Sequence, residues 1–270
     1  MKKKLRIGEL IIKSIIWLAA ISVLAVLMFI IVYILAKGIS VINWSFLTNI
    51  PHDMGRSGGI SSTIISTLII TAAAVAIAMP FGIGTAFYLA EYTRENIITR
   101  IIRFSAESLA GIPSIIYGLF GFIFFVIQMG LGWSVLSGAL TLAIMILPTI
   151  IRTAEEAIRT VPQSYREVSF SLGATKWQTI RKAVLPSALS GIANGIILSV
   201  GRCVAETAAV ILTAGSALQT RTMAVHFYTL ATEGISMKNA YGTAALLIII
   251  IFLINVVANM FINRFVAKNR

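Results

Sequence analysis

Long runs of apolar residues, nearly free of charge, limit the fold of this chain more than any other feature. Runs of roughly 20 such residues match the length of a helix that crosses the hydrocarbon core of a bilayer. With 58% hydrophobic and 12% charged residues and a mean hydropathy of +0.92, the chain has the composition of a membrane protein. Because backbone polar groups in lipid must pair internally, repeated runs of this kind predict a bundle of membrane-spanning helices.

Six such runs predict an all-α, polytopic fold with six transmembrane helices in one domain over residues 1–270. Their approximate limits are residues 14–36, 60–90, 104–128, 133–151, 187–214 and 240–262. The first run is longer than the apolar part of a cleaved signal peptide, which is about 7–15 residues, so we expect it to stay as an anchor. Six crossings place both termini on the same side of the membrane.

The basic residues predict which side this is. Of 22 lysines and arginines, 17 lie in the termini and loops of one face, four lie on the other face, and Arg202 lies within the fifth run. The positive-inside rule therefore predicts cytoplasmic termini and a cytoplasmic loop over residues 152–186. Orientation in a lipid bilayer then accounts for the net charge of +12, and no nucleic-acid partner is expected.

The end of this loop, EVSFSLGATKWQTIRKAVLP over residues 167–186, predicts two short helices joined by a tight turn. Ser164 to Glu167 has the spacing of a capping box, and Thr175 to Gln178 repeats it. Gly173 suits the left-handed residue that ends a helix, and Pro186 fits the first turn of the fifth span. Spacing alone leaves open whether this segment folds onto its own bundle or packs against another protein.

The same segment resembles the EAA loop of the permeases of ABC importers, which reads Glu-Ala-Ala, three residues, Gly, nine residues, Ile-x-Leu-Pro. The matching positions are Glu167, Gly173, Leu185 and Pro186. The departures are Val168 and Ser169 for the two alanines and Ala183 for the isoleucine. The resemblance implies a type I (MetI-like) importer permease fold in a bacterial plasma membrane.

In that family the loop forms a coupling helix that docks in a groove of a separate ATPase subunit. The resemblance gives this role to Ser164, Glu167, Gly173, Ala174, Thr175, Leu185 and Pro186. The chain has no Gly-x-x-x-x-Gly-Lys-[Ser/Thr] pattern, so we expect no phosphate-binding loop of its own. A permease subunit that is not an enzyme is therefore implied, with no cofactor in this chain and with ATP and Mg²⁺ bound by the partner ATPase.

Ionisable residues inside the apolar runs are candidates for a solute path, because burying them in a bilayer is costly. Arg202 and Glu206 are spaced i, i+4, so we expect them on one face of the fifth helix. They form either a salt bridge that only permits insertion or a site where Arg202 binds an oxyanion and Glu206 limits the affinity. Glu107, at the start of the third run, is a further candidate or an ordinary carboxylate at a helix start.

Four stretches point to a subfamily: GGISSTIISTL, MPFGIGTAFYLAEY, LAGIPSIIYGLFG and GRCVAETAAVILTAG. In this order, over residues 58–215, they resemble the permeases of the bacterial phosphate importer, and its A-type permease most. The resemblance implies a heterodimer with a C-type permease, two copies of an ABC ATPase and an extracytoplasmic phosphate-binding protein. It also links Arg202 and Glu206 to the passage of phosphate.

Small residues and prolines predict how the helices pack and bend. Gly191 and Gly195 form a small-residue face for a neighbouring helix. Pro80, Pro113 and Pro148 lie within or near spans and are expected to bend them.

Other functions remain open at this level. The same architecture could import another oxyanion, such as sulfate or molybdate. A secondary transporter driven by an ion gradient is less consistent, since neither an internal repeat nor a series of acidic relay residues is visible. His52 and His226 lie far from other ligand-type residues, so no metal site is expected, and the single Cys203 excludes an intrachain disulfide.

Overall fold

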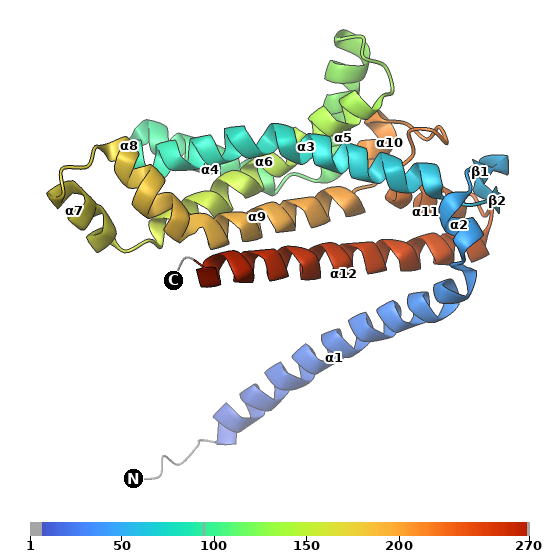
Figure 1. Ribbon diagram of the computed structural model, residues 1–270. Coiled ribbons are helices and arrows are strands. Elements are labelled where there is room, and N and C mark those ends of the chain that lie inside the picture. Colours follow the sequence, from blue (N-terminus) through green and yellow to red (C-terminus); the bar gives the residue numbers. More distant parts are fainter. Residues whose placement is uncertain (1–6, 94, 269–270) are drawn as a thin grey trace.

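The computed structural model describes residues 7–93 and 95–268. It is all-α apart from one short strand pairing, as predicted (Figure 1). The helices are α1 (Ile7–Gly38), α2 (Trp44–Thr48), α3 (Ser61–Phe87), α4 (Ile97–Ala110), α5 (Ser114–Gly121), α6 (Val135–Arg159), α7 (Gln163–Ser171), α8 (Lys176–Thr179), α9 (Leu185–Ala205), α10 (Ala208–Thr213), α11 (Met223–Thr232) and α12 (Met237–Lys268). The basic residues Lys2, Lys3, Lys4, Arg6, Arg94 and Arg270, used above for orientation, lie outside the described residues.

Shorter elements complete the chain. Two 3₁₀ turns, η1 (Ile39–Val41) and η2 (Asp53–Gly55), lie in the loop before α3, where β1 (Pro51–His52) pairs antiparallel with β2 (Ser57–Gly58). Three π-helical segments adjoin longer helices: η3 (Tyr88–Tyr92), η4 (Phe122–Gln128) and η5 (Ile180–Val184).

The central helix is α6, because α3, α4, α5, α9 and α10 all pack on it. Glycines allow the closest approaches. A Cβ added at Gly82 of α3 would lie 2.6 Å from the Ile150 side chain of α6, and one added at Gly191 of α9 would lie 2.5 Å from Ala157. Gly195 packs on Thr153 in the same way. The predicted small-residue face of the fifth span is therefore confirmed, and its partner is α6.

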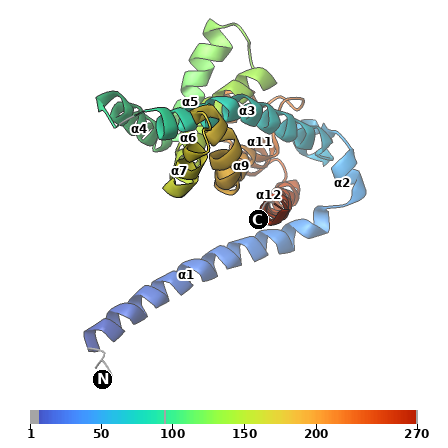
Figure 2. The ribbon, with the colours of Figure 1, turned by 60° about the vertical axis from the view of Figure 1, so that its left-hand side comes forward.

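In contrast, α1 leaves the bundle. It packs on α12 near Gly38, where an added Cβ would overlap Tyr241 and Ala245. Its other end projects far from the remaining helices (Figures 1 and 2). None of its most apolar stretch is buried inside the chain. This helix therefore presents apolar side chains on all sides to lipid or to another subunit.

The described residues contain five helices long and apolar enough to cross a membrane, or six if one bent pair counts as a single span. That pair is α4 with α5 and η4, which are bent by 100°. The third predicted span, residues 104–128, is therefore a bent pair that begins earlier, at Ile97, and the predicted bend at Pro113 is confirmed. The physical reason is the Gly111-Ile112-Pro113 sequence, because Pro113 cannot continue the hydrogen bonding of α4 and begins α5 instead.

The course of the chain nevertheless supports six crossings. The π-helical segment η3 ends near α7 and α8, whereas α6 begins at the other end of the molecule, so the bent pair returns the chain across the bundle (Figure 1). The described ends of α1 and α12 lie toward the end that holds α7 and α8. Pro80 and Pro148 lie inside α3 and α6 without interrupting them.

The end opposite α7 is fixed by a fully buried arginine. The Arg221 guanidinium donates to the Ser216 carbonyl at 2.8 and 2.6 Å and to the Met54 carbonyl at 3.3 Å. Its Nη1 also lies 3.4 Å from Nδ1 of buried His226. Burial, followed by the nearby Arg221 charge, lowers the pKa of His226 to about 4. These contacts hold the turn at Met54, whose φ of 60° is rare for a residue other than glycine.

Candidate functional site

The first candidate site is the predicted coupling segment. Its first helix, α7, begins at Gln163 after Pro162, with no side-chain cap, so the predicted capping box from Ser164 to Glu167 is wrong. Pro162 has no N–H that would need an acceptor, and its fixed φ suits the start of a helix. The helix therefore begins there without a side-chain cap. Ser164 and Glu167 both lie on exposed positions of α7.

The turn and the second helix agree with the sequence. Gly173 has a φ of +78°, and its amide donates to the Phe170 carbonyl at 2.9 Å while the Ala174 amide donates to Ser169 at 3.1 Å. These bonds satisfy carbonyls at the end of α7. Thr175 and Gln178 form the predicted capping box at the start of α8, with bonds of 3.3 and 2.8 Å.

The loop is shorter than the predicted range of 152–186. Residues 152–159 belong to α6, which ends at Arg159. At the other end, α8, η5 and α9 follow one another without a gap, so Leu185 and Pro186 begin α9 directly after a π-helical segment. Pro186 lies in the first turn of α9, as predicted. Because proline has no N–H, it cannot donate to the preceding turn, and that preceding turn is the wider, π-helical turn of η5.

One face of α7 is apolar and has no partner among the residues that the structure describes. Tyr165, Val168 and Leu172 follow the i, i+3, i+7 spacing of one helix face, and Leu172 is 83% exposed. Trp177 of α8 is also exposed. Exposed apolar side chains grouped on a short helix indicate a docking surface for another protein. We name Tyr165, Val168, Leu172 and Trp177 the coupling face.

The other side of α7 is anchored by an ion pair that the sequence did not reveal. Arg166 donates to Glu91 of η3 at 2.6 and 3.0 Å, and both side chains are largely buried. The same guanidinium donates to the carbonyls of Val161 at 2.8 Å and Ile158 at 3.0 Å. Residues 75 positions apart meet here, and no local pattern predicts such a pair.

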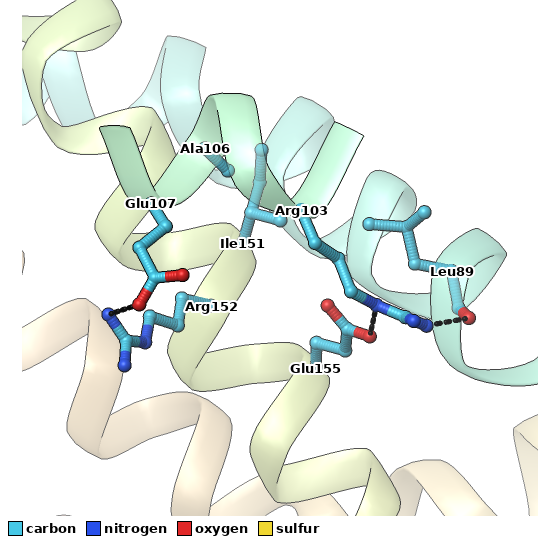
Figure 3. A pocket seen from close by; sticks show the side chains of 7 residues that line it. All are labelled: Leu89, Arg103, Ala106, Glu107, Ile151, Arg152 and Glu155. Carbon is cyan, nitrogen blue, oxygen red and sulfur yellow. Dashed lines mark hydrogen bonds and ion pairs between the residues drawn. The ribbon is translucent and has the colours of Figure 1, made fainter. Parts of the chain in front are cut away.

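A second group of charges lies between α4 and α6 and lines a cavity of about 180 Å³ (Figure 3). Arg103 of α4 donates to Glu155 of α6 at 2.8 Å, and Arg159 lies 3.1 Å from the same carboxylate. Glu107 pairs with Arg152 at 3.5 Å, and both side chains are mostly exposed. The predicted site residue Glu107 therefore has a surface ion pair, and the structure gives no contact between it and Arg202.

The third candidate is the region around Arg202. Here the predicted continuous fifth span is wrong, because α9 ends at Ala205 and α10 begins at Ala208. Glu206 has an extended backbone (φ −73°, ψ 127°), and its Oε1 accepts a hydrogen bond from the Ala209 amide at 3.2 Å. The carboxylate thus caps the next helix, which prevents Arg202 and Glu206 from sharing one helical face.

Arg202 is half-buried, and within the described residues it has neither an ion pair nor a hydrogen bond. The salt-bridge alternative is therefore wrong. The positive charge of Arg202 lies close enough to Tyr117 of α5 and to the neighbouring Cys203 to interact with them electrostatically. The Tyr117 hydroxyl donates to the Leu109 carbonyl at 2.7 Å and so spans the bend between α4 and α5.

Two interrupted helices consequently meet beside Arg202. A Cβ added at Gly118 of α5 would lie 2.9 Å from Ala209 Cα of α10, so these two short helices pack closely (Figure 1). Interrupted helices expose polar backbone groups where they line a path for solutes. A half-buried guanidinium without a partner at such a place can bind an oxyanion with several donors. Among the described residues, no group of three His, Cys, Asp or Glu could hold a metal ion.

Comparison with known proteins agrees with this architecture. Residues 78–270 match the family described as "Binding-protein-dependent transport system inner membrane component". The probable ABC transporter permease protein YqgI of Bacillus subtilis is 32% identical over 89% of this chain and 90% of its own length. The phosphate transport system permease protein PstA 1 of Mycobacterium tuberculosis is 36% identical over 79% of this chain and 73% of its own length.

A solved structure has the same fold. A chain of the MetNI methionine ABC transporter in an inward-facing conformation superposes with a TM-score of 0.67 at 21% identity, over 76% of this chain and 95% of that chain. At this identity the likeness shows the fold alone. Together with the family match over most of the sequence, it shows that the chain belongs to the inner-membrane permease components of binding-protein-dependent ABC transport systems.

Proposed function

We propose that this chain is one permease subunit of an ATP-driven importer of inorganic phosphate. The observation that supports a path for an anion is Arg202, which lies where two interrupted helices meet and has no ion pair or hydrogen bond within residues 7–93 and 95–268. Phosphate as the substrate is supported by relatives named as phosphate transport permeases, such as PstA 1. Glu206 would set the affinity through the field of its carboxylate, while its hydrogen bond to Ala209 fixes its position.

The proposed complex contains further subunits. A C-type permease would complete the path as a heterodimer, and two copies of an ABC ATPase would bind ATP and Mg²⁺ below it. An extracytoplasmic phosphate-binding protein would deliver the substrate. In the bacterial plasma membrane, both termini and the coupling face would then be cytoplasmic, in agreement with the excess of basic residues on that side. Glu167, Gly173 and Ala174 would belong to the segment that meets the ATPase, together with Ser164, Thr175, Leu185 and Pro186.

Uptake into vesicles tests this proposal. The chain would be reconstituted with its C-type partner, the ATPase and the binding protein, and uptake of labelled phosphate and sulfate would be measured with and without ATP. Phosphate uptake that depends on ATP is expected. Uptake of sulfate without phosphate would support the alternative oxyanion, and transport by this chain alone without ATP would contradict the role of the coupling segment.

A further inference from the structure

The helix α7 is attached to two membrane-spanning helices through one side chain. Arg166 makes two bonds to Glu91, which lies at the end of the second span, and two more bonds to carbonyls at the end of α6. The side chains of Arg166 and Glu91 are only 12% and 8% exposed. Four charge-assisted bonds from one planar guanidinium fix both the position and the orientation of α7 relative to these ends.

A further contact connects the same two regions. The Lys176 ammonium of α8 lies 4.9 Å from the centre of the Tyr92 ring, and Tyr92 belongs to η3 together with Glu91. Both short helices of the coupling segment therefore contact the end of the second span.

The covalent connection from α7 to the fifth span is less direct. It passes through the turn at Gly173, through α8 and through the π-helical segment η5 before α9 begins. Across this turn, a hydroxyl contact of 2.9 Å joins Ser169 and Thr179. A π-helical segment is a local irregularity that often lies at functional positions, and a glycine turn adds no rigidity.

We infer that Arg166 and Glu91 are positioning residues that make α7 move as one body with the cytoplasmic ends of α3 and α6. This inference rests on the proposed function, since it describes how force from the ATPase reaches the membrane. The displacement of α7 is transmitted to α3 and α6 through the buried pair. It reaches α9 separately, through η5, on which α7 packs directly and which continues into α9.

The chemistry of the Arg166–Glu91 pair predicts the effects of substituting either residue. Glu91→Gln keeps the shape of the side chain but removes the charge opposite Arg166, and Arg166→Lys cannot reproduce the four bonds of the guanidinium. A matched control is Glu95→Gln, because Glu95 also pairs with an arginine near this end, at 3.6 Å, but is 80% exposed.

The experiment uses the complete transporter in vesicles, with co-purification of the ATPase, ATP hydrolysis and phosphate uptake measured on the same samples. For Glu91→Gln we expect the ATPase to stay bound and active, with uptake per ATP hydrolysed reduced about 10-fold or more. Arg166→Lys should give an intermediate loss, and Glu95→Gln should match the unaltered chain. An unchanged ratio in Glu91→Gln would overturn the inference.

A cross-link provides a second, independent readout. Cysteines at positions 92 and 176, which lie in contact and leave the Arg166–Glu91 pair intact, would be joined by a short bifunctional thiol reagent in a chain with Cys203→Ser, and uptake would be compared before and after joining. If the coupling segment and the end of α3 move together, joining them preserves uptake; a block by the cross-link would overturn the inference. The cross-linking experiment tests the inference even if the complex with Glu91→Gln does not assemble. Absence of phosphate uptake by the unaltered complex would instead contradict the proposed function.

Discussion

Arg166 and Arg202 lie in very different surroundings although both are arginines at helices of the same membrane protein. Arg166 makes four hydrogen bonds to Glu91 and to backbone carbonyls. Arg202 is half-buried, and the described part of the chain offers it no hydrogen-bond partner or carboxylate. The carboxylate of Glu206, four residues further along the chain, is held at the start of α10 instead.

This difference distinguishes two roles of an arginine whose burial is energetically costly: one is structural, and the other is to bind a ligand. A buried charge with several hydrogen bonds to different elements holds those elements together, and removing its partner leaves an uncompensated charge. A guanidinium with free donors is available to a ligand, and its removal leaves no orphaned group behind. We therefore expect variants of Arg166 to reduce the uptake obtained per ATP hydrolysed, and variants of Arg202 to reduce transport itself.

The largest effect is expected from Arg202→Ala. Loss of several charge-assisted bonds to a passing anion should reduce phosphate uptake by about 100-fold or more, which corresponds to nearly 3 kcal/mol. The thermal stability of the complex should change by less than about 0.5 kcal/mol, because no partner loses its bond. Uptake in vesicles and thermal unfolding in detergent measure the two effects.

Arg202→Lys is the control, since it keeps the charge but not the planar fork and should retain part of the uptake. Normal uptake by Arg202→Ala would contradict the path. A collapse of assembly would show that Arg202 is structural, like Arg166, and would remove the contrast between them.

The next largest effect is the pH dependence of stability that His226 causes. His226 lies beside Arg221, which is fully buried and, like Arg166, has hydrogen-bond partners within the protein. Because the pKa of His226 is about 4 in the folded chain, compared with about 6.5 when unfolded, the unfolded chain binds more protons between these values. Stability should therefore fall as the pH is lowered, by about 2 kcal/mol between about pH 8 and about pH 5. Thermal unfolding across this range measures it.

His226→Gln is the control, because it removes the titrating ring and should flatten this part of the pH dependence. An equal dependence in both proteins would mean that other groups cause it. The contacts between Arg221 and His226 would then not explain the pH dependence of stability.

A smaller effect is expected from Gly173→Val at the turn after α7. A β-branched residue at a φ of +78° costs about 1–2 kcal/mol, and relief of this strain would displace the coupling face. Binding of the ATPase should weaken several-fold in co-purification. The matched control is Gly234→Val, because Gly234 has a similar φ of +64° with open space around it but lies between α11 and α12. Equal losses of ATPase binding in both variants would indicate a general defect.

The smallest effect is expected from Glu107→Gln. Glu107 and Arg152 are 67% and 63% exposed, and exposed pairs of this kind contribute about 0–1 kcal/mol. Uptake should change less than about 2-fold in the vesicle assay. A loss of 10-fold or more would place Glu107 on the solute path and would show that a partnered residue can also serve transport.

Several features of the candidate sites followed from short-range patterns. Gly173 and the capping box of Thr175 and Gln178 depend on bonds between residues at most a few positions apart, so the sequence predicted them correctly. The spacing of Ser164 and Glu167 was equally suggestive but misleading, because Pro162 begins α7 without a cap. A local pattern shows that a cap is possible, and competition with neighbouring residues decides whether it forms.

The spans show the same limit. Hydropathy located all the apolar runs, because burial in lipid depends on composition over roughly 20 residues. It did not locate the 100° bend after α4 or the break between α9 and α10. At the break, the Glu206 carboxylate bonds to the Ala209 amide instead of continuing the helix, a choice that average hydropathy cannot register.

The sequence by itself determined that this is an all-α membrane protein with most of its basic residues in its termini and in alternate loops, and with two short helices joined by a glycine turn before the fifth span, because these properties depend on composition and on spacing along the chain. Only the tertiary structure decided the rest. It paired Arg166 with Glu91, which are 75 residues apart, and it separated Arg202 from Glu206, which are only four apart. Ion pairs form between groups that packing brings together, and packing is a property of the whole bundle rather than of any one segment.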